Sequence, residues 1–122
     1  MPIRESISDT VAIFALEGSF LCEGEHDEFK SRLQKLIEGG IQCVIIDLGK
    51  VTCINSDGLG MLIGALSTLK QAKVELRLAN TTDLVDNLLI ITQLIKLFDT
   101  HQTVDQALAS HKNKKDSSPA AS

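Results

Sequence analysis

The sequence predicts a single α/β domain with a mixed, mostly parallel sheet. Strand-like segments alternate with segments of helical periodicity along the 122 residues, and this alternation is typical of parallel strands joined by crossover helices. The run from Ile41 to Leu48 is apolar almost throughout, as expected for a strand covered on both faces. The chain has the length of one domain and contains no internal repeat.

The first half of the chain predicts a hairpin, a helix and then this central strand. Thr10 to Glu17 is rich in apolar and β-branched residues, and Ile3 to Ser8 alternates weakly as its hairpin partner. From Asp27 to Glu38, apolar residues recur on one face of a helix, and a pair of glycines ends it. The residues on that face are Phe29, Leu33, Leu36 and Ile37.

The second half continues the alternation. A helix after Ser56 places apolar residues on one face, Lys73 to Ala79 alternates as a strand, and Leu84 to Ile95 predicts a third helix. The apolar face of the helix after Ser56 consists of Leu59, Leu62, Ile63, Leu66 and Leu69.

The C-terminal part predicts two short elements and a tail. Leu97 and Phe98 could form a short strand, and Thr103 opens a last helix with capping-box spacing. From His111 onward the sequence is polar and small, which is typical of disorder. We therefore expect a folded domain over residues 1–110 and a disordered tail over residues 111–122.

Composition excludes several classes of protein. The net charge of −4 and the pI near 5.3 argue against direct nucleic-acid binding, which normally uses a basic patch. No apolar run approaches the roughly 18 residues of a membrane span, and the N-terminal segment has no apolar signal core. These features predict a cytoplasmic protein without a membrane span.

The three cysteines, Cys22, Cys43 and Cys53, show no paired spacing. An odd number of cysteines without a secretory signal indicates reduced thiols rather than a disulfide framework. We expect Cys43 and Cys53 to pack as small apolar groups and Cys22 to lie in a loop.

The most informative stretch is DLGKVTCINSDGLG, from Asp47 to Gly60, which joins the central strand to the following helix. Ser56 is expected at the N-cap, where its oxygen would accept hydrogen bonds from free backbone N–H groups. Asp57 and Gly58 suit the first turn. Local chemistry alone favours a plain helix cap, although strand ends in α/β sheets commonly carry working residues.

The whole string resembles the signature of STAS domains, the anti-sigma factor antagonist family, which commonly reads Asp-Leu-Ser-x-Val-x-x-Ile-Asp-Ser-Ser/Thr-Gly-Leu-Gly. The resemblance extends from about Ile3 to Ala109, because the order of predicted elements also matches. It implies a mixed sheet with helices packed mainly on one face. It also places Ser56 at the position that a cognate anti-sigma kinase phosphorylates.

The resemblance further implies an anti-sigma factor antagonist that acts by partner switching. The unphosphorylated form would bind an anti-sigma factor serine kinase, phosphorylation of Ser56 would release it, and a serine phosphatase would reset the switch. No catalytic role, cofactor or metal is expected. The partner is expected to contact a rim that consists of Asn55, Asp57, Gly58, Leu59 and Gly60.

Three departures from the family pattern bear on phosphorylation. Asn55 stands where an Asp is usual, Asp57 replaces the second Ser/Thr, and Leu21 occupies the place of an Asp that lies near the phosphoserine in the family. A STAS scaffold or adaptor without phosphorylation, in a stress-sensing assembly or a lipid-transport ABC system, therefore stays open. So does a small-molecule or nucleotide binder that uses the same strand ends, although Gly58-x-Gly60 is too short for a phosphate loop.

Other candidate sites have a simpler explanation. Acids at the start of the first helix interact favourably with its dipole, and no matched His/Cys set accompanies them to make a metal site. Ser56 lacks the Gly-x-Ser-x-Gly elbow of a hydrolase. Leu89 and Ile90 lie off the main stripe of their helix, which fits equally a contact with the C-terminal helix or an exposed docking patch. The acidic cluster consists of Glu23, Glu25, Asp27 and Glu28, with His26 among them.

Overall fold

A computed structural model describes residues 3–19, 21–22 and 27–111 of the chain. Five strands form one sheet in the order β1-β2-β3-β4-β5. The first two pair antiparallel as a hairpin, and the other neighbouring strands pair parallel. The sheet is therefore mixed and mostly parallel, as predicted. The strands are β1 (Ile3–Ser8), β2 (Val11–Gly18), β3 (Cys43–Val51), β4 (Glu75–Ala79) and β5 (Asp99–His101).

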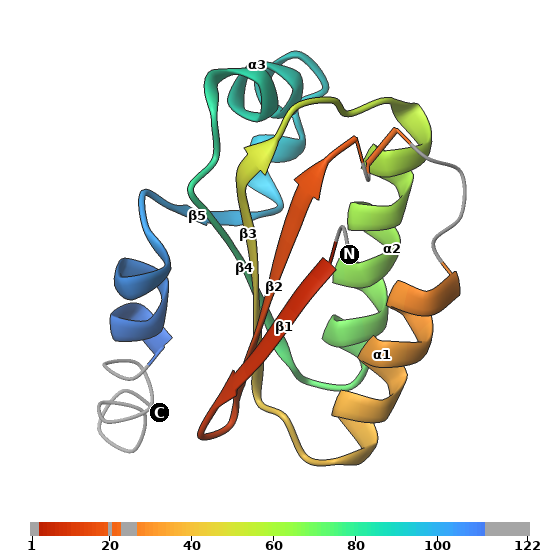
Figure 1. Cartoon of the computed structure of the whole chain (residues 1–122), viewed down its shortest axis with the longest axis vertical. Helices are drawn as coiled ribbons and strands as arrows, with labels where there is room; N and C mark the ends of the chain where they lie inside the picture. The colour runs from red at the N-terminus through yellow and green to blue at the C-terminus, as the bar shows by residue number, and fades with distance from the viewer. Residues whose placement is uncertain (1–2, 20, 23–26, 112–122) are drawn as a thin grey trace.

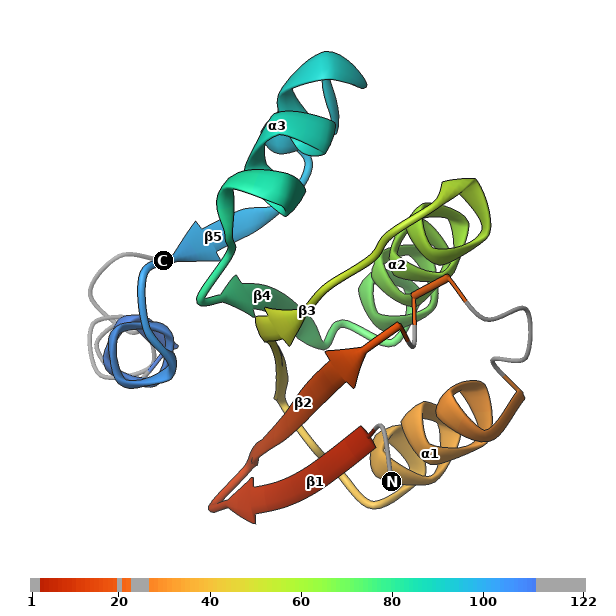
Figure 2. The same cartoon turned by 45° about the horizontal axis from the view of Figure 1, so that its top comes forward.

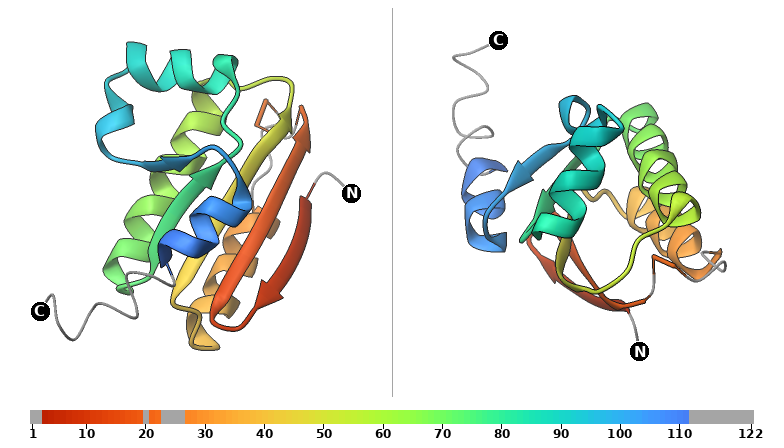
Figure 3. Two further views of the ribbon diagram at one scale, coloured as in Figure 1. Left: turned by 90° about the vertical axis from the view of Figure 1, so that its left-hand side faces the viewer. Right: turned by 90° about the horizontal axis from the view of Figure 1, so that it is seen from above.

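Two long helices cover one face of this sheet, and a short helix covers the other (Figures 1 and 3). The long helices are α1 (Asp27–Glu38) and α2 (Ser56–Gln71). The short helix spans residues 104–111. A further helix, α3 (Asp83–Ile91), and the 3₁₀ turn η1 (Leu94–Lys96) lie at the end of the sheet where the parallel strands finish (Figure 2). Within the described residues, no helix combines the length and apolar character that a bilayer crossing needs.

The central strand β3 is buried on both faces, as its apolar run predicts. Val44 and Ile46 point into the main core with the inner faces of α1 and α2. Cys43 and Ile45 point into a second core with Ala107 of the C-terminal helix. Alternate residues of a strand face opposite sides of a sheet, so a strand between two helical layers needs apolar residues at every position.

The predicted order of strands and helices is confirmed, but several predicted boundaries are wrong. β3 spans Cys43–Val51 rather than Ile41 to Leu48, and β4 begins at Glu75 rather than Lys73. The third helix ends at Ile91 rather than Ile95, because Gln93 adopts a left-handed conformation with φ 65° before η1 begins. The last strand is Asp99–His101 rather than Leu97 and Phe98. Phe98 instead buries its ring in the main core, and the next residues pair with β4.

The C-terminal helix extends the packed structure to His111. This side chain is buried, and its Nδ1 lies 2.7 Å from the Glu75 carboxylate. The sequence identifies no partner for His111, because Glu75 lies 36 residues away in the chain. The rest of the predicted tail, residues 112–122, lies outside the described residues, as do Glu23, Glu25 and His26 of the acidic cluster.

The prediction that all three cysteines are reduced is wrong. Cys22 and Cys53 form a disulfide, with their Cα atoms 5.8 Å apart, whereas Cys43 is not part of a disulfide and is buried as expected. The two cysteines are 31 positions apart in the sequence, but they follow β2 and β3, which are parallel neighbours. Parallel strands end at the same edge of a sheet, so the two loops meet there, and Leu21 forms a β-bridge with Ile54.

Candidate functional site

Asn55, and not Ser56, is the N-cap of α2. Its backbone is extended (φ −122°, ψ −173°), and its side-chain oxygen accepts a hydrogen bond from the Gly58 N–H at 3.0 Å. The expectation that Ser56 caps the helix is therefore wrong by one residue. An N-cap oxygen is committed to the helix, whereas Ser56 is the first residue of α2 and is exposed. Its hydroxyl makes no hydrogen bond to any other described residue.

The cap is anchored on the loop that follows β2. The Asn55 N–H donates to the Leu21 carbonyl at 3.5 Å, and the Asn55 side-chain amide donates to the Cys22 carbonyl at 3.4 Å. Leu21 is fully buried. The loop that precedes Ser56 is therefore joined to the loop after β2 by a backbone hydrogen bond, a side-chain hydrogen bond and the Cys22–Cys53 disulfide.

Gly58 allows the close approach of these two loops. A Cβ atom at this position would lie 2.0 Å from the Leu21 carbonyl oxygen, so only glycine fits. Gly58 is consequently buried against its own chain. The sequence predicts Gly58 as part of the partner-binding rim, whereas in the structure it is buried against Leu21.

The other predicted rim residues differ in their exposure to solvent. Asp57 and Gly60 are exposed, and a Cβ at Gly60 would meet open space. Leu59 is half-buried against the main core. Asn55 is exposed, although its side chain is engaged in the cap. The reachable rim therefore consists of Asn55, Asp57 and Gly60, with part of Leu59.

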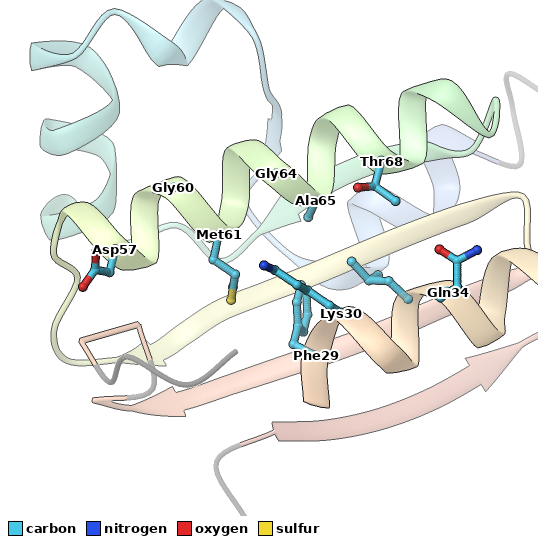
Figure 4. Close-up of a pocket in the computed structure, with 10 residues that line it drawn as sticks. Phe29, Lys30, Gln34, Asp57, Gly60, Met61, Gly64, Ala65 and Thr68 are labelled. Atoms are coloured by element: carbon cyan, nitrogen blue, oxygen red, sulfur yellow. The ribbon is translucent and has the colours of Figure 1, made fainter. Parts of the chain in front are cut away.

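A groove between α1 and α2, which was not predicted, extends along α2 from Asp57, the residue after Ser56 (Figure 4). It has a volume of about 670 Å³, with Asp57 and Gly60 of α2 among its lining residues. A signal for it exists in the sequence, since Gly60, Gly64 and Thr68 follow one another at intervals of four and so share a helix face. The groove is also lined by Phe29, Lys30, Leu33, Gln34, Met61 and Ala65.

The strand ends hold a second, polar pocket of about 490 Å³. The Asp47 carboxylate accepts hydrogen bonds from the Gly49 N–H and from the Asn80 side-chain amide, both at 3.0 Å. The first bond lies within β3, and the second joins β3 to the residue that follows β4. Lys50 is the cationic residue of its lining, and the loop lacks the glycine-rich pattern that cradles a phosphate chain.

Helix α3 and the turn after it lie at the same end of the molecule as the start of α2 (Figures 1 and 3). They carry several exposed apolar side chains. We call Leu84, Ile90, Ile91 and Leu97 the α3 patch; each is exposed, Ile91 to 78%. Leu89 is fully buried in the main core. The two alternatives for this helix are thus resolved residue by residue: Leu89 packs inside, away from the C-terminal helix, and Ile90 is exposed.

Comparison with protein families finds a match to the STAS domain model over residues 3–107. Comparison with curated proteins finds no match. Among solved structures, the chain is similar to a putative anti-sigma factor antagonist from Thermotoga maritima, with a TM-score of 0.80 and 20% identity over 88% of this chain and 92% of that one.

Two further similar structures are named for different functions, one as an anti-sigma factor antagonist and one as a transporter domain. One is an anti-sigma factor antagonist from Mycobacterium paratuberculosis, with a TM-score of 0.74 and 18% identity over 88% of this chain and 91% of that one. The other is the STAS domain of a SulP transporter from Vibrio cholerae, with a TM-score of 0.68 and 17% identity over 92% of this chain and 88% of that one. At these identities, the structures establish the fold that the chain shares with them.

Proposed function

Because the chain belongs to the STAS domain family, matched over residues 3–107, we propose that it is a cytoplasmic anti-sigma factor antagonist that acts by partner switching. The unphosphorylated protein binds an anti-sigma factor serine kinase. Phosphorylation of Ser56 releases the kinase, and a serine phosphatase restores the binding form. The protein acts by binding and performs no catalysis itself.

The observation that carries this proposal is the exposed, uncommitted hydroxyl of Ser56. Asn55 supplies the cap of α2, so a kinase can take the serine hydroxyl without removing a bond that holds the helix. The N-terminus of a helix also tolerates a phosphate, because its free N–H groups and dipole favour negative charge. Modification of Ser56 therefore adds charge to the surface while the fold stays intact.

The added charge is large enough to act as a switch. A phosphate brings about −1.5 to −2 charge at neutral pH. If the partner presents an acid about 6 Å away, each added charge costs about 2–3 kcal/mol at an effective dielectric near 20. A phosphate then weakens binding by roughly a hundredfold or more. Asp57, also exposed, already gives this surface a negative charge before any modification.

The surface around Ser56 suits a protein partner. The α3 patch lies at the same end of the molecule as the start of α2 (Figure 1), and apolar side chains at the centre of an interface commonly carry much of the binding energy. We propose that the kinase covers the α3 patch together with Ser56, Asn55, Asp57, Leu59 and Gly60. Gly58 is left out because it is buried.

The direct experiment is to incubate the full chain with a candidate anti-sigma kinase and ATP and to map the phosphate by mass spectrometry. We expect a single phosphate on Ser56 and none on the Ser56→Ala variant. Ser67→Ala is the matched control, because Ser67 is also exposed on α2 but lies near the other end of that helix. Phosphate on Ser67, or none on Ser56 with an active kinase, contradicts the proposal.

A second candidate function is a STAS scaffold or adaptor that is not phosphorylated. The observation that favours it is Leu21, which is fully buried and bridged to Ile54 where the family commonly has an acid near the phosphoserine. Under this alternative the Ser56→Ala and Ser56→Glu variants bind the partner equally well, and no kinase modifies the chain.

A further inference from the structure

We propose that Cys22 and Cys53 are a reversible redox pair whose oxidation state controls the order of the loop that presents Ser56. In the oxidised form the disulfide fixes this loop on the loop after β2, and reduction loosens it. The change in the order of this loop is inferred from the structure alone. The expected change in affinity for a kinase rests on the function proposed above.

The pair lies directly beside the cap of α2. Cys53 precedes Ile54 and Asn55 in the chain, and the Cys22 carbonyl accepts a hydrogen bond from the Asn55 side-chain amide at 3.4 Å. The oxygen of the same Asn55 side chain holds the Gly58 N–H at 3.0 Å. Asn55 therefore connects the loop of Cys22 to the first turn of α2. A shift of Cys22 should change the positions of Asn55 and Gly58, which lie on either side of Ser56 in the sequence.

The arrangement favours reversible rather than permanent pairing. The loops are also joined without the disulfide, by the Leu21–Ile54 bridge and by the Thr52 N–H donating to the Gly18 carbonyl at 2.9 Å. After reduction these contacts keep the two thiols within the Cα separation that a disulfide requires. Both cysteines are half-buried, so a small reagent can reach them.

The third cysteine does not compete for either partner. Cys43 begins β3 and is fully buried in the second core, whereas the pair lies beyond the ends of β2 and β3. These two cysteines can therefore re-form only one intramolecular disulfide without disturbing the sheet. A pair with one accessible pairing is what a two-state redox site needs.

The chemistry is thiol–disulfide exchange with a low-molecular-weight disulfide of the glutathione type. The thiolate of one cysteine attacks a sulfur of this oxidant, which forms a mixed disulfide and releases one small thiol. The second cysteine thiolate then attacks the protein sulfur of the mixed disulfide, which forms the Cys22–Cys53 bond and releases the second small thiol. Two electrons and two protons pass from the protein pair to the oxidant, and a small dithiol reverses the process.

The first test measures the pair itself, without any partner. The folded full chain is equilibrated in mixtures of reduced and oxidised glutathione, quenched in acid, alkylated and mapped by mass spectrometry. We expect Cys22 and Cys53 to change together, from disulfide-bonded at high oxidised glutathione to alkylated at high reduced glutathione. The state of Cys43 should stay the same throughout. A pair that stays oxidised in the native protein under excess dithiothreitol, or that never oxidises, overturns the proposal.

The second test measures the loop. We expect native-state amide hydrogen exchange over residues 52–58 to be about tenfold faster after reduction, while residues 44–48 of β3 exchange at the same rate in both states. The variant Cys22→Ser with Cys53→Ser should behave like the reduced protein in either buffer, and Cys43→Ala should keep the redox response. Equal exchange in the oxidised and reduced proteins overturns the proposal.

A third arm connects the pair to the partner. Reduction leaves the binding loop to be ordered on association, so we expect the reduced protein to bind the kinase about tenfold more weakly than the oxidised protein. Equal binding in both states overturns the coupling to the partner. If the mass-spectrometric and exchange results hold while no kinase binds either form, the proposed function fails and the redox site stands.

Discussion

At the scale of single residues, one position separates the cap of α2 from the serine that we propose is phosphorylated. The side-chain oxygen of Asn55 accepts a hydrogen bond from the Gly58 N–H. The next residue, Ser56, is exposed. A serine at the cap itself would have its hydroxyl oxygen committed to a backbone N–H of the helix, in a bond whose removal typically costs about 1 kcal/mol. The observed arrangement separates the stability of the helix from the chemistry of the serine.

The glycines of the same turn have opposite roles, which a pair of variants distinguishes. Gly58→Ala should destabilise the protein by about 1–3 kcal/mol or more, because the new Cβ would meet the Leu21 carbonyl oxygen at 2.0 Å. Gly60→Ala should be neutral or stabilising by about 0.5–1 kcal/mol, because it lowers the entropy cost of the helix and enters open space. Urea unfolding of both variants measures the difference. Equal free energies of unfolding would mean that Gly58 does not hold the loops together.

The sequence predicts the location of this site but not the roles of its neighbours. The motif around Ser56 places a serine at the junction of strand and helix, and the structure shows a serine exposed there. The choice between Asn55 and Ser56 as the cap depends on backbone angles that both residue types accept at an N-cap. The burial of Gly58 depends on Leu21, whose loop is distant in the chain, so local chemistry could not reveal it.

At the scale of elements, β3 and α2 carry the site because both are held firmly by the core. Leu62 and Leu69 of α2 are fully buried, whereas Ile63 is partly exposed and Leu66 is half-buried. The helical periodicity correctly predicts that Leu62 and Leu69 are buried, but the prediction is wrong for Ile63, which is exposed. It also misses Met61 and Ala65, which are buried. The amount of burial is set by α1 and the sheet, which the pattern of one helix does not contain.

Truncation of two leucines on α2 tests this difference in depth. Leu62→Ala should lower the free energy of unfolding by about 2–5 kcal/mol, because it leaves a cavity in a fully packed core. Leu66→Ala should cost clearly less, since its side chain is only half-buried. Both values come from denaturant unfolding. A larger loss for Leu66→Ala would contradict the orientation of α2 described above.

The C-terminal helix is fixed to the sheet by a buried arginine of β4. The Arg77 guanidinium lies 3.1 Å from the Ser110 hydroxyl and 3.1 Å from His101 Nε2, and 3.4 Å from the Glu75 carboxylate. Arg77→Ala should therefore destabilise the protein by about 2–4 kcal/mol, because it removes a buried side chain together with its hydrogen bonds to half-buried groups. Thermal unfolding followed by circular dichroism measures this loss. Arg4→Ala, which removes a largely exposed ion pair with Glu17, is the control and should change stability little.

At the scale of the whole molecule, the parallel sheet brings distant loops to one edge. Cys22 and Cys53 are joined there, and the start of α2 and the α3 patch lie at the same end (Figure 1). The alternation of strands and helices predicts the sheet, yet spacing in the sequence could not pair cysteines 31 positions apart. Pairing required the knowledge that β2 and β3 are neighbours, which only the folded topology supplies.

The disulfide should also contribute to global stability. A cross-link over this separation removes entropy from the unfolded chain, which is worth about 2–4 kcal/mol. The variant Cys22→Ser with Cys53→Ser should unfold at a correspondingly lower urea concentration than the oxidised protein, while the reduced wild type should resemble the variant. Identical midpoints for the oxidised protein and the variant would show that the cross-link adds nothing to the folded state.

The affinity of an anti-sigma factor kinase for charge variants of α2 tests the central claim most directly. Isothermal titration calorimetry would compare the wild type, Ser56→Glu and Ser67→Glu, which place the same charge at the two ends of one helix. We expect Ser56→Glu to bind about ten- to a hundredfold more weakly and Ser67→Glu to bind like the wild type. Wild-type affinity for Ser56→Glu would contradict the claim that negative charge at this serine releases the partner.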